Sequence, residues 1–122
     1  MSKTILAVDD SISMLQTLSL TLEKEGYKVV TAEDGMQGLE RLEGDEKFHL
    51  IITDIHMPNM DGITFTKKIR GNTKYKFTPI IILTSENQME KKKEGKAAGA
   101  TGWIIKPFQP NQFISVVRKV CP

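Results

Sequence analysis

Short runs of apolar residues alternate with longer amphipathic segments along the whole chain. We expect the short runs to form five β-strands, at Thr4–Val8, Lys28–Ala32, Leu50–Thr53, Ile80–Leu83 and Gly102–Ile105. The unbroken apolar run at Ile80–Leu83 suits a strand that is covered on both faces, as the strands of parallel sheets are. Because alternation of strands with helical segments is typical of repeated βα units, the pattern predicts an α/β protein with a parallel sheet.

The segments between these runs have apolar residues at helical spacing. Five helices are expected: the first on Leu15, Leu18 and Leu22, ending near Gly26; the second on Met36, Leu39 and Leu42; the third at about Ile63–Arg70; the fourth near Gln88–Ala98; the fifth on Phe113, Val116, Val117 and Val120. Asp34 with Gln37 three residues later resembles a capping box at the start of the second helix. Pro110 suits the first turn of the fifth helix. Gly95 inside the fourth helix costs about 1 kcal/mol relative to alanine.

Composition and charge limit the classes of function. The 122 residues have 39% hydrophobic and 26% charged residues, enough for one domain, residues 1–122, with its own core. No apolar run approaches the roughly 20 residues of a membrane span, so we expect no membrane partner. The single cysteine, Cys121, favours a reducing compartment, and we expect a cytoplasmic protein. The net charge of +2 does not indicate nucleic-acid binding, and an amphipathic last helix favours a monomer.

Residues with charged or reactive side chains directly follow four of the expected strands. Asp9 and Asp10 follow the first strand and Asp54 the third, whereas Thr84 follows the fourth and Lys106 the fifth. Ligands of open parallel sheets bind beyond the carboxyl ends of the strands, so we expect these side chains to meet. Neighbouring carboxylates repel one another, and a hard cation such as Mg²⁺ relieves the repulsion. A carboxylate can also attack phosphorus, while an ammonium and a hydroxyl stabilise the moving phosphoryl group.

Taken singly, each of these residues has an ordinary explanation. Asp9-Asp10 could cap a helix, Asp54 could lie in a turn, Thr84 could cap the next helix and Lys106 could be a solvated strand end. Together, these explanations require several coincidences in one fold.

The complete set resembles the receiver domains of two-component response regulators. The resemblance rests on Asp9-Asp10, on Asp54 with Met57-Pro58 and Asp61-Gly62, on Thr84, and on Lys106-Pro107-Phe108, and it covers essentially the whole chain. The stretch Gly95–Trp103 is most similar to single-domain chemotaxis regulators of the CheY-like type. The resemblance implies a flavodoxin-like, doubly wound (βα)5 fold whose five parallel strands lie in the order 2-1-3-4-5.

The resemblance also implies a role for each residue. Asp54 would be the phosphoacceptor, with Thr84 and Lys106 contacting the phosphoryl group. Mg²⁺ would be bound by the side chains of Asp10 and Asp54, by the backbone carbonyl of His56, and by Asp9 through a water. Thr84 and Trp103 would form the switch, although an aromatic residue at this place can also be ordinary packing. Lys106-Pro107 would be a cis peptide, and the side chains of His56 and Glu86 would line the access to the phosphate.

The implied partners are proteins. A sensor histidine kinase would donate the phosphoryl group from a phosphohistidine. A downstream protein, such as a component of the flagellar motor switch, would read the signal, and a phosphatase could remove it. The chain would not be an enzyme beyond catalysing its own phosphorylation and slow dephosphorylation.

Other functions stay open at this point. A flavin mononucleotide carrier shares the fold but needs a Ser/Thr/Gly-rich phosphate loop after the first strand, where Asp9-Asp10 would repel phosphate. A phosphatase of the haloacid dehalogenase type has its nucleophile on the first strand in an Asp-x-Asp pattern, whereas these acids are adjacent. The chain could also be part of a longer regulator, but we expect 122 residues to be the whole protein. An inactive pseudo-receiver usually lacks one of the five site residues, and all five are present.

Overall fold

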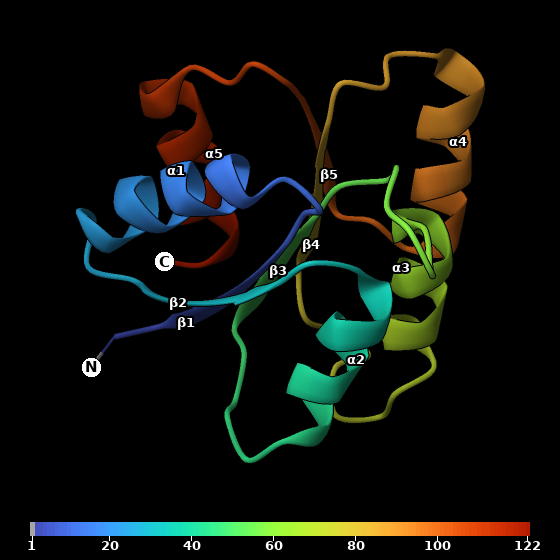
Figure 1. Cartoon of the computed structure of the whole chain (residues 1–122), viewed down its shortest axis with the longest axis horizontal. Helices are drawn as coiled ribbons and strands as arrows, with labels where there is room; N and C mark the ends of the chain where they lie inside the picture. Colours follow the sequence, from blue (N-terminus) through green and yellow to red (C-terminus); the bar gives the residue numbers. More distant parts are fainter. Residues whose placement is uncertain (1) are drawn as a thin grey trace.

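The computed structural model describes residues 2–122 and places five parallel strands in one sheet in the order β2-β1-β3-β4-β5 (Figure 1). The strands are β1 (Thr4–Val8), β2 (Lys28–Ala32), β3 (Leu50–Thr53), β4 (Ile80–Thr84) and β5 (Gly102–Ile105). The helices that follow them are α1 (Ile12–Glu23), α2 (Gly35–Glu43), α3 (Gly62–Arg70), α4 (Met89–Ala98) and α5 (Pro110–Val120). The predicted fold class and strand order are confirmed, and β4 includes Thr84, one residue beyond the expected end.

Helices cover both faces of the sheet, α1 and α5 on one side and α2, α3 and α4 on the other (Figure 1). Successive strand residues point to opposite faces, so each of the central strands supplies both layers of the core. Ile5 of β1 packs in the cluster with Leu18 of α1 and Phe113 of α5, whereas the next residue, Leu6, packs with Phe65 of α3. The continuous apolar runs of the sequence therefore reflect burial on two faces.

The second helix is turned differently from the prediction. Met36, expected on its buried face, is 48% exposed, and the buried residues of α2 are Gly35, Gly38 and Leu42. The reason is close packing of the backbone, because a Cβ atom at Gly38 would lie 2.6 Å from the ring of Phe65. A glycine face thus takes the place of the methionine, and Met36 turns outward.

The start of α2 shows one half of the predicted capping box. The Asp34 carboxylate accepts a hydrogen bond from the backbone N–H of Gln37 at 2.8 Å, as expected of an N-cap. The Gln37 side chain reaches back to the N–H of Glu33, at 2.9 Å, and not to that of Asp34. Asp34 uses its second oxygen to accept from the Asn59 amide at 2.7 Å, which ties the start of α2 to the loop after β3.

No helix in the described part of the chain has the length and hydrophobicity needed to cross a membrane.

Candidate functional site

Strand register brings the predicted site residues to one edge of the sheet. Val8 of β1 pairs with Thr53 of β3, so the residues that follow them, Asp9 and Asp54, leave adjacent strands at the same level. The N–H of Asp54 still bonds the carbonyl of Val8 at 3.0 Å, which holds this first residue after β3 in place. On the far side of the sheet, the N–H of Lys106 donates to the carbonyl of Thr84 at 2.9 Å.

Three carboxylates form the centre of the site. Asp9, Asp10 and Asp54 each offer an oxygen, and these atoms all lie within 4.8 Å of one another. Asp9 and Asp54 are buried, with exposed fractions of 2% and 8%, whereas Asp10 is exposed. The buried pair is held by the backbone: Asp9 Oδ1 accepts from the N–H of Ser11 at 2.9 Å, and Asp54 Oδ1 accepts from the N–H of Ile55 at 2.6 Å. No hydrogen bond to the Asp10 carboxylate is found among residues 2–122, so its oxygens are available.

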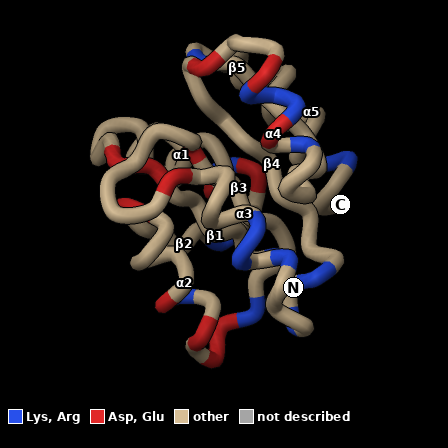
Figure 2. The backbone as a smooth tube through the Cα atoms, turned by 90° about the vertical axis from the view of Figure 1, so that its right-hand side faces the viewer, with Lys and Arg blue, Asp and Glu red and all other residues tan. Residues whose placement is uncertain are grey.

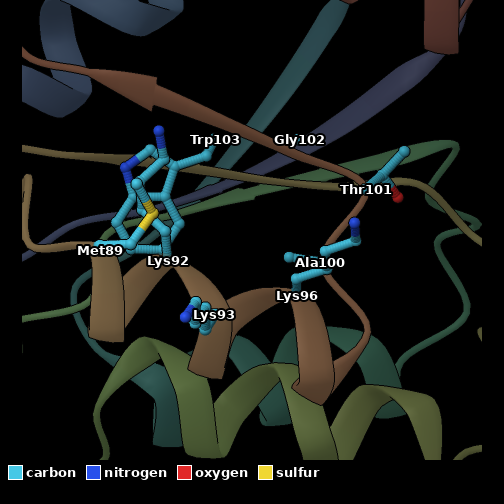
Figure 3. Close-up of a pocket in the computed structure, with 8 residues that line it drawn as sticks. All are labelled: Met89, Lys92, Lys93, Lys96, Ala100, Thr101, Gly102 and Trp103. Atoms are coloured by element: carbon cyan, nitrogen blue, oxygen red, sulfur yellow. The ribbon is translucent and has the colours of Figure 1, made fainter.

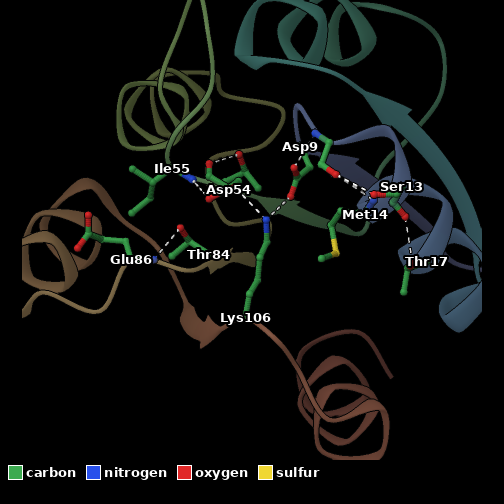
Figure 4. A network of polar contacts seen from close by, with 11 residues as sticks. Asp9, Ser13, Met14, Thr17, Asp54, Ile55, Thr84, Glu86 and Lys106 are labelled. Carbon is green, nitrogen blue, oxygen red and sulfur yellow. Dashed lines mark hydrogen bonds and ion pairs between the residues drawn. The ribbon is translucent and has the colours of Figure 1, made fainter.

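The Lys106 ammonium bridges the two buried carboxylates (Figure 4). Its Nζ lies 2.7 Å from Asp9 Oδ2 and 2.9 Å from Asp54 Oδ2. Burial by itself lowers the pKa of Lys106, but the hydrogen bonds and charges of Asp9 and Asp54 outweigh burial and hold that pKa above its ordinary value. The lysine is therefore a permanent cation beside the oxygens on which chemistry would occur.

This donor set suits a hard divalent cation. Oxygen ligands from a few carboxylates, completed by waters or phosphate oxygens, are what Mg²⁺ binds in proteins. Three negative charges meet a single ammonium in the cluster, so the site retains an excess of negative charge that a cation would neutralise. Asp9, Asp10 and Asp54 could each offer an oxygen to the ion, and direct binding by Asp10 and Asp54 stays a prediction. The metal role of the His56 carbonyl stays a prediction.

Thr84 and the two side chains predicted to line the access lie next to this cluster. Thr84 is fully buried, and its Oγ1 accepts a hydrogen bond from the N–H of Glu86 at 3.2 Å. His56 Nε2 lies 3.0 Å from Glu86 Oε1, and this contact lowers the pKa of the Glu86 carboxyl. The His56 side chain is 59% exposed, so the imidazole faces solvent. We did not predict the His56–Glu86 contact. A signal for it was present in the sequence, because a basic and an acidic residue stand at equivalent positions, two residues beyond Asp54 and Thr84.

Gly62 allows the loop after β3 to fold back on the acceptor. Its N–H bonds the carbonyl of Ile55 at 2.8 Å, and a Cβ atom at this position would lie 1.9 Å from the carbonyl oxygen of Asp54. No side chain larger than hydrogen fits there without moving the backbone of Asp54. Asp61 then caps α3 by accepting from the N–H of Thr64 at 2.8 Å. The Asp61-Gly62 pair is thus explained by backbone packing.

Comparison with known proteins agrees with this geometry. Residues 5–118 match the family described as the response regulator receiver domain. The chain belongs to the response regulator receiver family. It is 36% identical to chemotaxis protein CheY1 of Helicobacter pylori, over 87% of this chain and 86% of the relative. This membership separates it from flavin mononucleotide carriers and from phosphatases of the haloacid dehalogenase type.

Solved structures show the same fold. The chemotaxis protein CheY4 of Vibrio cholerae is 48% identical, with a TM-score of 0.93 over 98% of this chain and 99% of that one. The receiver domain of a sensor histidine kinase from Pseudomonas aeruginosa, described with a magnesium ion coordinated in its active site cleft, is 25% identical, with a TM-score of 0.90 over 98% of each chain.

Some sequence relatives are longer than this chain. The transcriptional regulatory protein PhoP of Bacillus subtilis is 38% identical over 98% of this chain, but the match spans only 49% of that relative.

Trp103 of this receiver lies against α4, and Gly95 makes the close approach possible. A Cβ atom at Gly95 would lie 2.9 Å from the indole ring and 3.0 Å from the end of Ile82. The glycine that weakens α4 therefore accommodates the aromatic ring. Trp103 Nε1 is buried and has no hydrogen-bond partner in the described structure, so no polar contact fixes the indole.

A groove of about 470 Å³ runs along α4 and β5 beside this ring. Figure 3 shows Trp103 above the first turn of α4, next to Met89 and Lys92, with Lys93 and Lys96 farther along the same helix. Met89 is 65% exposed. The groove thus combines apolar surface with the lysines of the fourth helix.

Proposed function

We propose that this receiver accepts a phosphoryl group on Asp54 from the phosphohistidine of a sensor histidine kinase, with Mg²⁺ as cofactor, and that phosphorylation changes its affinity for a downstream protein. The observation that carries the proposal is the Lys106 ammonium, which contacts both Asp54 and Asp9 inside a cluster of three carboxylates. A purely structural ion pair would not need a third acid that makes no hydrogen bond. Membership in the receiver family supports phosphoryl transfer as the reaction class.

In the proposed reaction, a carboxylate oxygen of Asp54 attacks phosphorus in line with the departing histidine nitrogen. The new P–O bond forms as the P–N bond breaks, and the electron pair of that bond returns to the imidazole ring. The N–H of Ile55 holds Asp54 Oδ1 and orients the carboxylate, and Lys106 donates to the oxygens of the transferred group. When bound, Mg²⁺ supplies positive charge to the carboxylates and to the phosphoryl oxygens.

The phosphorylated state would be sensed by Thr84 and Trp103. The Thr84 hydroxyl accepts from Glu86 and retains its own proton, which it can donate to a phosphoryl oxygen. A movement of Thr84 toward the phosphate would free space for the Trp103 ring. The ring could move without breaking a hydrogen bond, because its buried N–H has no partner in the described structure. Full conversion between two states needs about 5.5 kcal/mol of differential stabilisation. A few charge-assisted hydrogen bonds to the phosphoryl group supply much of that amount.

The readout surface is formed by α4, β5 and α5, where the groove beside Trp103 and its lysines lie. Because the lining is both apolar and basic, a downstream protein with an acidic segment and an apolar anchor would fit it. The chemotaxis proteins CheY1 and CheY4 among its relatives favour a role in chemotaxis. From the resemblance to such regulators we propose a flagellar motor switch component as the target. We further propose that the receiver is a cytoplasmic monomer that binds no nucleic acid. Its catalytic activity would be limited to its own phosphorylation and slow dephosphorylation, and a phosphatase could also remove the phosphoryl group.

The test is direct phosphorylation by a small-molecule phosphodonor. The protein is incubated with acetyl phosphate, with and without Mg²⁺, and analysed by intact mass and peptide mapping. We expect a single added phosphoryl group on the peptide that contains Asp54, formed only with Mg²⁺ and absent in Asp54→Asn. Persistent Mg²⁺-dependent labelling of that variant would refute Asp54 as the acceptor. Labelling of the unaltered protein that does not depend on Mg²⁺ would refute the cofactor.

A further inference from the structure

The end of the sheet opposite to the carboxylate cluster has a basic surface. Lys3, His49 and Pro79 directly precede β1, β3 and β4, so they lie at the amino ends of the strands, away from Asp54. Between Asp61 and Glu86 the chain has five basic residues and no acidic one. Figure 2 shows lysines and arginines gathered below α3 and around the amino-terminal end of the chain. The net charge of the chain is small, but its distribution is uneven.

An aromatic ring projects from the middle of this surface. Phe77 is 89% exposed, more than any other large hydrophobic residue among those described. Its loop is well anchored, because Tyr75, two residues before Phe77, is buried and its hydroxyl donates to the carbonyl of Glu46 at 3.2 Å. Lys76 Nζ lies 5.7 Å from the centre of the Phe77 ring. The exposed ring is thus presented by a fixed loop with a cation beside it.

Further cations surround a shallow pocket at the base of this loop. The pocket has a volume of about 380 Å³, and Lys3, Lys47 and Lys74 line it together with Phe77. No acidic side chain lines it among the described residues. The acids nearest in sequence are Asp45 and Glu46, and Glu46 is paired with Lys28 at 2.6 Å. None of these three lysines forms an ion pair within residues 2–122, so their ammonium groups give the pocket a basic lining.

We propose that this surface, defined by Lys3, Lys47, Lys74, Lys76 and Phe77, adsorbs the receiver to an anionic phospholipid bilayer. Lysines near an anionic bilayer each strengthen binding by up to about fivefold, and an aromatic ring at the interface adds hydrophobic anchoring. A bilayer satisfies both features at once, since it offers a plane of phosphates with hydrocarbon directly below. A duplex nucleic acid offers the phosphates but no apolar layer for Phe77.

The shape of the surface favours a bilayer over an acidic peptide. A peptide anchor would need a deep apolar slot, whereas here the apolar group projects outward and the pocket beside it is shallow and open. Adsorption of this kind needs no spanning helix. It therefore departs from the expectation of no membrane partner, which rested only on the lack of a long apolar run. It would also leave Asp54, at the other end of the sheet, facing away from the bilayer and accessible to a phosphodonor.

Vesicle sedimentation tests the proposal. The full chain is mixed with vesicles of neutral phosphatidylcholine and with vesicles that contain about 30% anionic phosphatidylglycerol, at low and at high salt. We expect sedimentation with the anionic vesicles only, and weaker sedimentation at high salt. Lys74→Glu/Lys76→Glu should reduce partitioning more than about tenfold, and Phe77→Ser should reduce it about fivefold to tenfold at unchanged charge.

Matched controls separate this surface from general properties of the chain. Lys92→Glu/Lys93→Glu changes the net charge by the same amount on α4, and Leu20→Ser removes an apolar side chain that is 66% exposed on α1. Both should sediment like the unaltered protein, and circular dichroism should show that all variants are folded. Equal losses in the controls and in the Lys74/Lys76 or Phe77 variants would overturn the proposal, as would equal binding to neutral vesicles.

Two competitors distinguish other sources of phosphate. Soluble glycerol 3-phosphate should not displace the protein from vesicles, because it offers no surface and no hydrocarbon; displacement would show a pocket for free phosphate esters instead. Duplex DNA that binds more tightly than vesicles, with no effect of Phe77→Ser, would assign the surface to nucleic acid and overturn the proposal. Phosphorylation of Asp54 is measured separately and does not depend on any of these results.

Discussion

The Lys106 ammonium lies 2.7 Å from Asp9 Oδ2 and holds the most buried carboxylate of the cluster. It also contacts Asp54 Oδ2 at 2.9 Å, so one side chain serves as counter-charge for two acids. A divalent cation bound by these acids must share them with the lysine. Metal affinity and the position of Lys106 are therefore linked by electrostatics.

The first prediction follows from this competition. Lys106→Ala should bind Mg²⁺ more tightly, by about threefold to tenfold, because removal of the ammonium leaves three carboxylates with no counter-charge. The same variant should accept phosphate more slowly, since the group that stabilises the transferred phosphoryl is lost. Isothermal calorimetry measures the affinity, and labelling by acetyl phosphate measures the rate. Lys92→Ala is the control for loss of one positive charge. Mg²⁺ affinity that stays equal to, or falls below, that of the control would show that the lysine does not compete for the carboxylates.

A second prediction concerns Gly95 and the position of Trp103. Gly95→Ala favours the helix by about 1 kcal/mol, but the new methyl group must displace the indole ring, which would lie 2.9 Å away. We expect the ring to move outward, with a red-shifted fluorescence maximum, because Trp103 is the single tryptophan and reports its own exposure. Ala97→Gly, at an exposed position of α4, is the control for helix propensity. An unshifted spectrum would mean that Ile82 yields to the methyl group and the indole does not.

The strands could be predicted from the sequence because their residues are buried on both faces. The apolar run Ile80–Leu83 predicts a strand without any knowledge of the neighbouring strands. Parallel topology then places Asp9 and Asp54 at the same edge of the sheet. Met36 was placed wrongly because apolar spacing identifies side chains and does not reveal a helix that packs through its glycines. The exposure of Phe77 was not foreseen, since Tyr75 and Phe77 both neighbour Lys76 in the sequence, and only the structure shows that Tyr75 is buried and Phe77 exposed.

Bonds set by the path of the backbone were the least predictable part of the structure around the site. The backbone N–H of Ile55 fixes the Asp54 carboxylate, and this bond depends on the path of the loop and not on the identity of residue 55. The Asp34–Asn59 bond joins two loops whose sequences carry no common pattern. Motifs of the family identify which residues act, but the bonds that hold those residues belong to the three-dimensional structure.

Asp34 gives a prediction about pH. Its pKa lies below the ordinary carboxyl value, chiefly because the N–H of Gln37 and then the Asn59 amide bond its charged form. A depressed pKa stabilises the fold at pH values above the unfolded-state pKa, and this contribution is lost as the pH falls through the folded-state pKa. Asp34→Asn should therefore lower the free energy of unfolding at neutral pH by about 1 kcal/mol, since an amide cannot accept both bonds through oxygen.

The pH profile distinguishes this account from a simple loss of packing. Urea unfolding of the two proteins should give stabilities that converge below the ordinary carboxyl pKa, where Asp34 is protonated in the folded state as well. Asp45→Asn, at an exposed position outside any helix, is the control for the loss of one carboxylate. A gap that persists unchanged into strong acid would mean that the charge of Asp34 plays no part.

Arg70 gives the last prediction, because its guanidinium joins two segments through carbonyl groups alone. Nε and Nη2 donate to the carbonyl of Gly99, at 3.0 and 2.9 Å, and Nη1 donates to that of Thr78 at 2.7 Å. Arg70→Lys replaces a planar fork by one ammonium that cannot reach both ends, so we expect a loss of about 2 kcal/mol in the free energy of unfolding.

Amide exchange locates the effect of Arg70→Lys. The N–H groups of Thr78 and Thr101, which lie in the two joined segments and are hydrogen-bonded at 3.2 and 2.7 Å, should exchange faster than in the unaltered protein. Arg118→Lys is the matched control, since its partner Glu25 is on the surface and exposed pairs of this kind contribute little to stability. If both variants lose the same stability, water can replace the guanidinium at these carbonyls. The end of α4 would then be held by its other contacts, which include the packing of the buried Ala98 and the bond from the N–H of Ala100 to the carbonyl of Gly95.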